Sequence, residues 1–287
     1  MTVRDLGYRP YEGVRLPPSN NTWVMLRHGL ARAWASWLVK IAVLLSAGPL
    51  LVFSVYVALA LYMMRTQMGG GGEALPEFDG TQPLRYLYAS ETWLAVSLLT
   101  LGAGAPAIAE DLTFRAFQFY FAKPVTPEQY YGGRALAVAI PIFAVTFIPA
   151  ILVDLVMVAM SPVDGAVESL GLLLPCLVYS VILAVVMGAG SVAISSLSKS
   201  RALTMSAWVL CFVVPHALAA VVDGIGHWPW LYLASFTGLL GVIADALFHV
   251  DTESQLHWWH ALPVLAVFVA GSIALSLHRL RTAEVIA

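Results

Sequence analysis

The chain has 287 residues, of which 60% are hydrophobic and only 11% are charged, and its formal net charge is −2. A soluble globular domain carries about 25% charged residues, so this composition excludes the class of soluble globular domains. The nearly neutral charge also gives no sign of nucleic-acid binding. Several apolar runs reach the roughly 20 residues that cross a bilayer, and the sequence therefore predicts an all-α, multi-span membrane protein.

The chain begins with a polar leader over residues 1–20, predicted to be either a disordered tail or a strap that lies on a partner protein. Residues 21–35 follow, and they place Trp23, Leu26 and Trp34 at helical spacing with basic residues between them. This pattern is typical of an amphipathic, interfacial elbow helix, with its apolar side in lipid and its basic side toward anionic headgroups.

Residues 36–287 are expected to form a single transmembrane domain with six spans. The predicted spans are 36–64, 88–108, 133–160, 169–196, 202–222 and 259–277. The first span is long, and we expect Gly48-Pro49 to bend it. We also expect Pro106 to kink the end of the second span, because proline removes a backbone donor and clashes with the preceding turn.

The distribution of positive charge predicts the orientation of the chain. With a cytoplasmic N-terminus, the inner segments hold nearly all of the 15 lysine and arginine residues, and only Arg65 and Arg85 lie outside. Such a bias follows the positive-inside rule. We therefore expect both termini to face the cytoplasm.

Residues 228–248 are apolar and long enough to cross, but a seventh crossing would place Arg279 and Arg281 outside. We therefore predict a re-entrant helical hairpin that enters from the outer face and is broken near Gly238 and Gly241. Irregular backbone at this depth needs shielding by protein or contact with water, so the hairpin is expected to cover a cavity.

The loop between spans 2 and 3, residues 109–130, combines charged residues with an aromatic run at 117–121. After this run, Thr126 is expected to cap a new helix, with Pro127 at its first position and Gln129 closing a capping box. The predicted result is a short amphipathic helix, a turn, and a helix that leads into span 3. Such a segment could transmit motion from a soluble partner, or it could cover lipid headgroups.

The loop carries the pattern A-I-A-E-D, then F-Q-F-Y-F, then K-P-V-T and Y-x-G-G-R at the start of a span. This combination resembles the ABC-2 type permease family, the membrane subunits of ABC exporters. In that family the corresponding loop is the coupling helix that docks on an ATPase subunit. The resemblance implies that the docking residues are Glu110, Asp111, Arg115, Phe117, Phe119, Phe121, Thr126 and Gln129.

The same resemblance implies the partners and the location. It suggests a homodimer of the permease, two copies of an ABC ATPase subunit, membrane lipid around the dimer, and an extracytoplasmic accessory protein as a further partner. It also suggests a bacterial inner membrane, and some members of the family have a similar hairpin between their last two spans.

No ATP-binding motif is present in the chain. Its three lysines, Lys40, Lys123 and Lys199, all lie outside any G-x-x-x-x-G-K-[ST] pattern, and neither G-x-S-x-G nor H-E-x-x-H occurs. We therefore expect a subunit that is not an enzyme and has no cofactor of its own, with ATP and Mg²⁺ bound by the partner ATPase.

Two ionisable residues fall inside predicted spans at similar depths, Asp154 in the third and His216 in the fifth. A carboxylate inside the bilayer is costly and usually faces a partner or a water-filled cavity. We hypothesise that Asp154 and His216 line a substrate path or pair across it. The alternative is a structural hydrogen bond without substrate contact.

A polar cluster precedes the last span and consists of His249, Asp251, Glu253, His257 and His260. Histidine and carboxylate together are reasonable metal ligands. Polar residues in an outer loop are also typical of a solvated segment, and Trp258 and Trp259 fit an interfacial aromatic belt. We therefore expect no metal site, and keep this cluster as a minor alternative.

The function predicted from these features is that of a permease subunit of an ABC exporter. One alternative is a non-transporting membrane anchor or mechanical transducer for an ABC ATPase, which drives an outer partner. Another is a metal-handling membrane protein that uses the outer cluster of histidine and aspartate.

Overall fold

The computed structural model describes residues 20–67, 84–85, 87–89, 92–117, 120, 125–160, 170–226, 228–250 and 256–286. The predicted leader lies outside these residues except for Asn20. Within the described residues all regular structure is helical and no strand occurs, which confirms the all-α prediction for this part of the chain.

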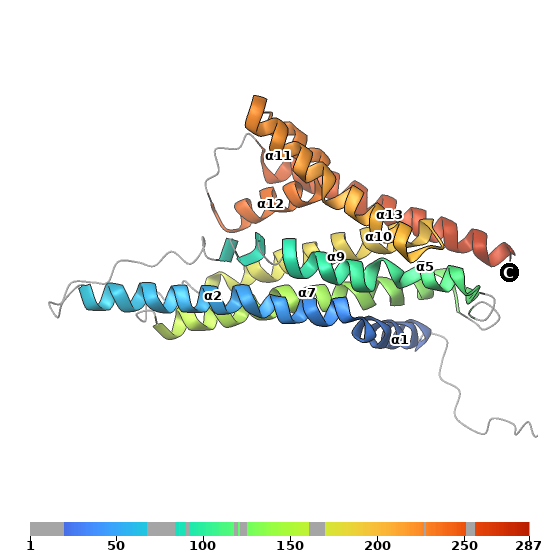
Figure 1. Ribbon diagram of the computed structural model, residues 1–287, viewed down its shortest axis with the longest axis horizontal. Coiled ribbons are helices and arrows are strands. Elements are labelled where there is room, and N and C mark those ends of the chain that lie inside the picture. Colours follow the sequence, from blue (N-terminus) through green and yellow to red (C-terminus); the bar gives the residue numbers. More distant parts are fainter. Residues whose placement is uncertain are drawn as a thin grey trace, which may run out of the picture.

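The elements follow one another as a series of helices (Figure 1). They are α1 (Asn21–Ala35), α2 (Trp37–Gln67), η2 (Thr92–Val96), α4 (Ser97–Leu99), η3 (Thr100–Gly104), α5 (Pro106–Thr113), α7 (Pro127–Met160), α9 (Leu173–Leu197), α10 (Arg201–Phe212), α11 (Val214–Gly226), η4 (Pro229–Ala234), α12 (Phe236–Leu247) and α13 (Trp258–Ile286). The segments η2 and η3 are π-helical, and η4 is a 3-10 helix.

Five of the described helical segments are long and apolar enough to cross a membrane, and a sixth arises if α1 and the start of α2 are counted as one bent span. The five are Leu87–Thr113, Pro127–Ala159, Leu173–Leu197, Arg201–Gly226 and Trp258–Thr282. The chain therefore has the character of a multi-pass membrane protein. The sixth candidate joins the predicted elbow helix to the start of the predicted first span, so it differs from the span 36–64 expected from the sequence.

Helix α9 lies at the centre of the bundle and packs against α7, α13 and α5. In its most apolar window 72% of the residues are buried, compared with 17% in the α10–α11 segment and 22% in α13. Helices α2 and α7 run beside each other on one side of α9, whereas α11 and α12 diverge from them at the end remote from the C-terminus (Figure 1).

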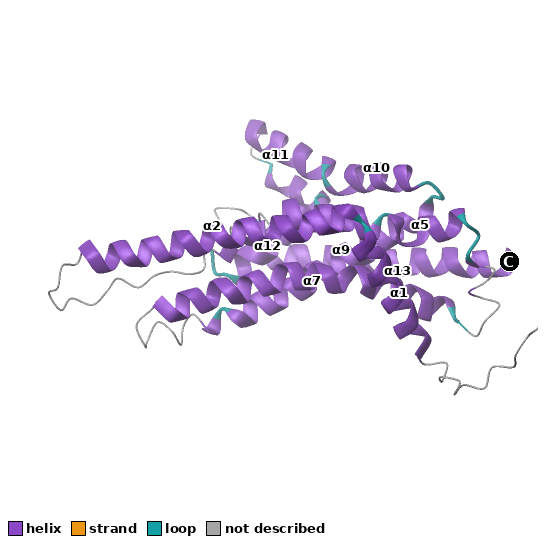
Figure 2. Ribbon diagram, turned by 60° about the horizontal axis from the view of Figure 1, so that its bottom comes forward, coloured by secondary structure: helices purple, strands orange, loops and turns teal. Residues whose placement is uncertain are grey.

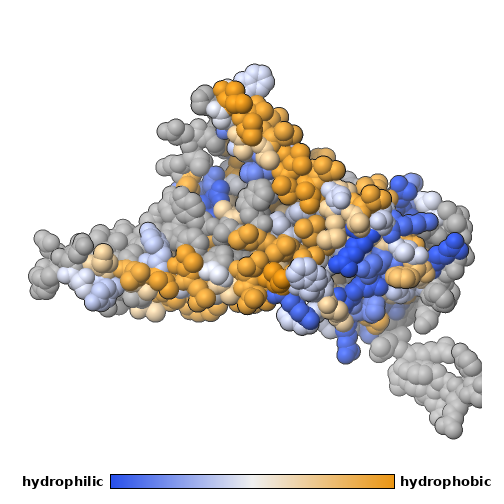
Figure 3. Space-filling view, in the orientation of Figure 1, coloured by the Kyte–Doolittle hydropathy of each residue, from blue (hydrophilic) through white to orange (hydrophobic). Residues whose placement is uncertain are grey.

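Charged side chains gather at one end of the bundle, which we call the charged end. It holds α1, the last turn of α5, the first turns of α7 and the C-terminal part of α13 (Figure 2). Hydrophilic surface is concentrated there, while the surface along α2 and α11 is largely hydrophobic (Figure 3). This division is expected for a bundle whose long apolar sides face lipid.

The sharp bend near the start of the chain lies at Ser36, where α1 and α2 meet at 78°. Helix α2 continues through Gly48-Pro49 without interruption, so the predicted bend does not break the helix there. Proline inside a membrane helix is tolerated when neighbouring groups satisfy the freed carbonyl.

Helix α1 crosses α7 at very short range because glycines lie at the crossing. A Cβ atom on Gly133 would lie 2.4 Å from Cβ of Met25 and 2.9 Å from the carbonyl oxygen of Thr22. A Cβ atom on Gly29 would lie 2.5 Å from Cβ of Ala137. Small residues at such crossings allow helices to approach closely in membranes.

The two adjacent glycines of α7 provide a matched test of this crossing. We expect Gly133→Ala to lower the midpoint of thermal unfolding by several degrees, because α1 must move away from α7. Gly132→Ala should leave it unchanged or raise it slightly, since its Cβ would meet only Thr22 Cγ2 at 3.7 Å. Unfolding of the purified variants in detergent measures both. Equal effects would show that close approach does not explain the glycine at 133.

The segment predicted as a hairpin forms η4 and α12, and the break between them lies at Ser235. Ser235 caps α12 by accepting a hydrogen bond from the backbone N–H of Gly238 at 3.1 Å. The break predicted near Gly238 and Gly241 is therefore wrong, since both glycines lie inside α12. Gly238 is needed for packing instead, because a Cβ atom there would lie 2.8 Å from the Tyr232 ring. With 12 residues, α12 is too short to cross a bilayer.

Candidate functional site

The candidate site is the last part of span 2, where α5 follows two π-helical segments. Pro106 occupies the first position of α5, a position that proline favours because the missing N–H has no partner there in any helix. The predicted kink at Pro106 is thus replaced by wider turns before it and a new helix after it. Such π-turns are frequent at functional sites.

Ser195 of α9 holds the start of α5 in place. Its hydroxyl donates to the carbonyl of Ala105 at 2.6 Å and accepts from the backbone N–H groups of Ile108 and Ala109 at 2.9 and 3.0 Å. Ser195 is fully buried, so these hydrogen bonds are formed away from water. One side chain therefore satisfies three backbone groups and fixes α5 to the central helix.

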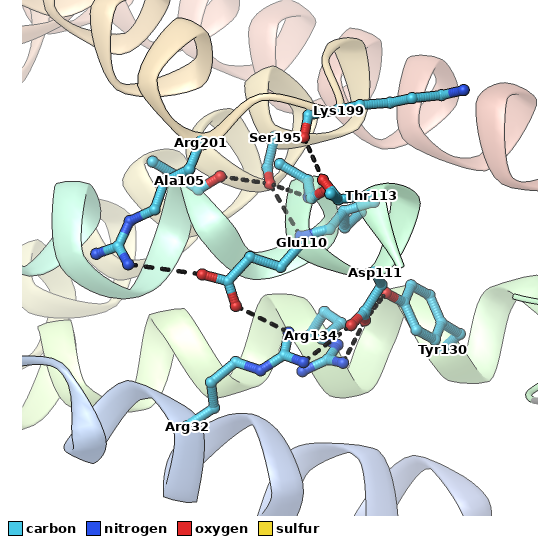
Figure 4. Close-up of polar contacts among 12 residues, drawn as sticks. Arg32, Ala105, Glu110, Asp111, Thr113, Tyr130, Arg134, Ser195, Lys199 and Arg201 are labelled. Carbon is cyan, nitrogen blue, oxygen red and sulfur yellow. Dashed lines mark hydrogen bonds and ion pairs between the residues drawn. The ribbon is translucent and has the colours of Figure 1, made fainter. Parts of the chain in front are cut away.

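Asp111 joins α5 to α1 and α7 (Figure 4). Its Oδ1 pairs with Arg32 Nη2 at 3.0 Å, and its Oδ2 accepts from the Tyr130 hydroxyl at 2.5 Å and from Arg134 Nη2. Asp111 and Arg134 are each only 1% exposed. The Arg134 guanidinium also lies 5.4 Å from the centre of the Tyr130 ring, a cation–π distance.

Glu110 extends the connections of α5 to α10. Its carboxylate lies 3.8 Å from Arg32 Nη1 and 3.6 Å from Arg201 Nη1, and its side chain is 28% exposed. The hydroxyl of Thr113 donates to the carbonyls of Ala109 and Lys199, which ties the end of α5 to the turn before α10 (Figure 4). Helix α5 is therefore joined to α1, α7, α9 and α10. We call Arg32, Glu110, Asp111, Tyr130, Arg134 and Arg201 the Asp111 network.

One neighbour of the Asp111 network, His28 of α1, favours its neutral form. Partial burial, together with the nearby guanidinium groups of Arg134 and Arg32, lowers the pKa of His28 in α1. His28 is therefore neutral at pH 7 and adds no further positive charge beside the two arginines.

Beyond α5 the chain turns through Phe114 and Arg115, which we call the α5 tip. The backbone N–H of Ala116 donates to the carbonyl of Asp111 at 2.9 Å, and that of Arg115 faces the carbonyl of Leu112 at 3.4 Å. This is a Schellman motif, in which glycine usually takes the left-handed position. Here Arg115 occupies it with φ of 52°. The Phe114 side chain is 76% exposed.

We expect Arg115→Gly to stabilise the folded chain by about 1 kcal/mol, because glycine avoids the cost of the left-handed backbone. A strained residue on an exposed turn points to a function for its side chain rather than to stability. Thermal unfolding measures the gain. A loss of stability would mean that the Arg115 side chain makes a structural contact instead.

The structure separates the predicted docking residues into four groups, the last of which is the pair Thr126 and Gln129. Asp111 and Phe117 are buried, at 1% and 5% exposure, so the prediction that they contact a partner directly is wrong. Asp111 binds arginines of its own chain, and the Phe117 ring packs 5.3 Å from that of Tyr130. Glu110 is partly exposed and Arg115 exposed. Phe119 and Phe121 lie outside the described residues.

Thr126 and Gln129 form the predicted capping box at the start of α7. The Gln129 side chain accepts from the backbone N–H of Thr126 at 3.2 Å, and the Thr126 hydroxyl accepts from the N–H of Gln129 at 3.3 Å. The capping box is confirmed, and these two side chains begin the helix that carries Tyr130 and Arg134.

The sequence did not predict a role in this site for Phe114, Arg32, Tyr130 or Arg134. A signal for two of them was present in Y-x-G-G-R, because Tyr130 and Arg134 are four residues apart and so share one face of α7. Arg32 lies 79 residues before Asp111, and nothing local predicts that pair.

Asp154 and His216 lie in different surroundings. Asp154 of α7 is fully buried near Cys176, and neither carboxylate oxygen has a hydrogen-bond partner in the structure. His216 of α11 lies 3.2 Å from the Ser235 hydroxyl through Nδ1. The prediction that Asp154 and His216 pair is therefore wrong for this conformation. The neutral carboxylic acid is the form of Asp154 that such surroundings accommodate.

Because the site favours a neutral side chain, we expect Asp154→Asn to change the free energy of unfolding by less than about 0.5 kcal/mol. The asparagine amide is nearly the same size and is also uncharged. Unfolding of both proteins in detergent provides the comparison. A loss of several kcal/mol would reveal a charged Asp154 with a counter-charge and would revive its role in a substrate path.

The outer polar cluster is only partly described. His257 and His260 stack with ring centres 6.0 Å apart, and His260 Nδ1 accepts from the backbone N–H of His257 at 3.2 Å. His249 has a left-handed φ of 52°, and Asp251 and Glu253 lie outside the described residues. Among the described residues no three His, Cys, Asp or Glu side chains lie close enough to hold a metal ion.

Comparison of the chain with models of known protein families and with curated protein sequences finds no match.

Proposed function

We propose that this chain is the membrane subunit of an ABC-type exporter and that the α5 tip docks on a separate ATPase subunit. The observation that carries the proposal is the Asp111 network. It binds the segment behind an exposed, strained turn to α1, α7 and α10, while Ser195 binds it to α9. This arrangement suits the transmission of force from a soluble partner into the bundle.

The strength of the network supports this use. Removing one partner of a buried ion pair costs about 3–5 kcal/mol, because the remaining charge is left uncompensated. A displacement of the α5 tip would therefore move α1, α7 and α10 together rather than slide them past one another. Helix α7 extends to the opposite end of the bundle, so the movement would reach both sides of the membrane (Figure 1).

The orientation belongs to the same proposal. The charged end faces the cytoplasm of a bacterial cell, in agreement with the positive-inside rule, and both termini lie there. Helix α1 then lies at the inner surface as the elbow helix, and the 109–130 loop is the coupling segment. The η4–α12 segment enters from the outer face, where the ion pair between Arg85 and Asp245 anchors α12.

The working complex would contain two copies of this chain and two ATPase subunits. ATP and Mg²⁺ would bind the ATPase subunits, since no phosphate-binding motif occurs in this sequence. Binding of ATP would draw the two α5 tips together and shift the bundle between two conformations, which is a population shift rather than chemistry on this chain.

Purification of the tagged full-length chain from its native membranes tests the proposal. We expect an ATPase subunit with a Walker-type phosphate-binding loop to co-purify, and we expect the complex to hydrolyse ATP. A chain that purifies intact without a nucleotide-hydrolysing subunit under several mild detergents would contradict the proposed function.

A further inference from the structure

An apolar groove of about 590 Å³ lies between α1, α2 and α7. Its lining includes Leu30 and Trp34 of α1, Val43 and Ala47 of α2, and Ala144 and Leu152 of α7. This volume is within the range of about 300–1,000 Å³ found for ligand pockets. The groove is separate from the Asp111 network, which lies on another face of α1 and, at Tyr130 and Arg134, about two turns nearer the charged end along α7.

Small side chains and prolines shape the groove. Alanine residues from all three helices line the groove. Pro141 and Pro149, which also line it, interrupt the backbone hydrogen bonding of α7. The polar Ser46 in the lining is satisfied internally, because its hydroxyl donates to the carbonyl of Val43 at 2.8 Å. The occupant therefore needs an apolar body.

The length of the groove fits one leaflet of a bilayer. From Pro141 to Leu152 the lining extends about 16 Å along α7, at about 1.5 Å per residue. Half of the hydrocarbon core of a bilayer is about 15 Å. A partner helix that crossed the whole membrane would need a groove about twice as long, whereas a lipid acyl chain needs one leaflet.

The charged end of the groove is basic. Arg27 lies three, four and seven residues before Leu30, Ala31 and Trp34, so it shares their face of α1. Lys40 lies three and seven residues before Val43 and Ala47, so it shares their face of α2. Both side chains are exposed. Neither forms an ion pair with any described carboxylate, whereas Arg32, on another face of α1, binds Asp111.

Two exposed tryptophan side chains also lie at the charged end of the groove. Trp34 and Trp37 are 59% and 65% exposed on either side of the bend at Ser36. Tryptophan favours the boundary between headgroups and hydrocarbon. The groove therefore begins at the membrane surface with two available cations and continues into one leaflet with apolar walls.

We propose that this groove binds one anionic phospholipid, with its headgroup between Arg27 and Lys40 and an acyl chain along Ala47 and Ala144. The lipid fills the angle between α1 and α2 and so sets the position of α1 on α7. This inference needs only a membrane around the bundle and does not depend on an ATPase partner.

Native mass spectrometry of the delipidated full-length protein tests the proposal, with phosphatidylglycerol and phosphatidylcholine of identical acyl chains as probes. We expect one phosphatidylglycerol to bind at least tenfold more tightly than phosphatidylcholine. Arg27→Gln with Lys40→Gln should remove the preference, by about fivefold for each charge. Arg279→Gln, an exposed arginine of α13 at the same end, should not change it.

A second variant tests the acyl-chain part of the groove. Ala144→Phe should fill the groove and weaken binding of both lipids, whereas Ala159→Phe, exposed on α7 outside the lining, should not. Equal binding of the two lipids to the unchanged protein, or retention of the preference in the double glutamine variant, would overturn the proposal. So would a changed subunit number in Ala144→Phe with lipid binding intact, which would assign the groove to a protein contact.

Discussion

Asp111→Ala is expected to destabilise the folded protein strongly, with a loss of about 3–5 kcal/mol in the free energy of unfolding. The substitution leaves Arg134 buried at 1% exposure without its carboxylate partner, and it also removes one of the partners of Arg32 and of Tyr130. Because folded proteins are stable by only about 5–15 kcal/mol, such a loss is a large fraction of the total. The yield of monodisperse protein and its thermal unfolding in detergent measure the effect.

The neighbouring acidic residue is the control. Glu110→Ala removes two ion pairs at 3.8 and 3.6 Å from a partly exposed side chain and should cost less than about 1 kcal/mol. Asp111→Leu combined with Arg134→Met should be more stable than Asp111→Ala, since no unpaired charge remains buried. Similar losses for Glu110→Ala and Asp111→Ala would contradict the structure of the network.

Phe114→Ala is expected to leave the fold unchanged and to weaken binding of the proposed ATPase subunit by about 30-fold, which corresponds to a contact worth about 2 kcal/mol. Phe114 is 76% exposed on the α5 tip, so its removal costs little in the isolated chain. An exposed aromatic side chain at the end of a rigid segment is a typical interface anchor. ATP hydrolysis by the co-purified complex, measured against subunit concentration, reports the loss.

Phe117→Ala gives the opposite pattern and serves as the matched control. Phe117 is 5% exposed and packs on Tyr130, so its removal should lower the free energy of unfolding by about 3–5 kcal/mol. If Phe114→Ala lowered stability while ATP hydrolysis stayed normal in the assembled complex, the α5 tip would be a structural turn and the docking surface would lie elsewhere.

Features formed by residues close together in the sequence could be predicted, whereas contacts between distant residues could not. Apolar runs and the capping box between Thr126 and Gln129 are local, and both were predicted correctly. The burial of Asp111 was not, because it depends on Arg32, which lies 79 residues away, and on the packing of α1 across α7. The pairing of Ser195 with the start of α5 spans 86 and 87 residues and has no local signal.

The type of a side chain was also not enough to predict which residues are exposed for docking. Phe114 and Phe117 are the same residue three positions apart, yet one is exposed and the other buried. The Schellman motif separates them, since the left-handed turn at Arg115 reverses the chain after α5. Because arginine is unusual at that position, the sequence predicted no helix end there. The break at Ser235 was missed in a similar way, because glycines were taken as the breaking residues while a serine cap forms the boundary.

Site-specific photo-crosslinking in native membranes can show whether the α5 tip contacts an ATPase subunit. A photoreactive phenylalanine analogue replaces Phe114 on the α5 tip in one strain and Trp228, 69% exposed and remote from the charged end, in another. Position 114 is expected to crosslink to a subunit with a Walker-type phosphate-binding loop, with a yield that changes on addition of ATP, whereas position 228 is not. Crosslinks from position 114 only to lipid or to the chain itself, or equal crosslinking of an ATPase at both positions, would contradict this expectation.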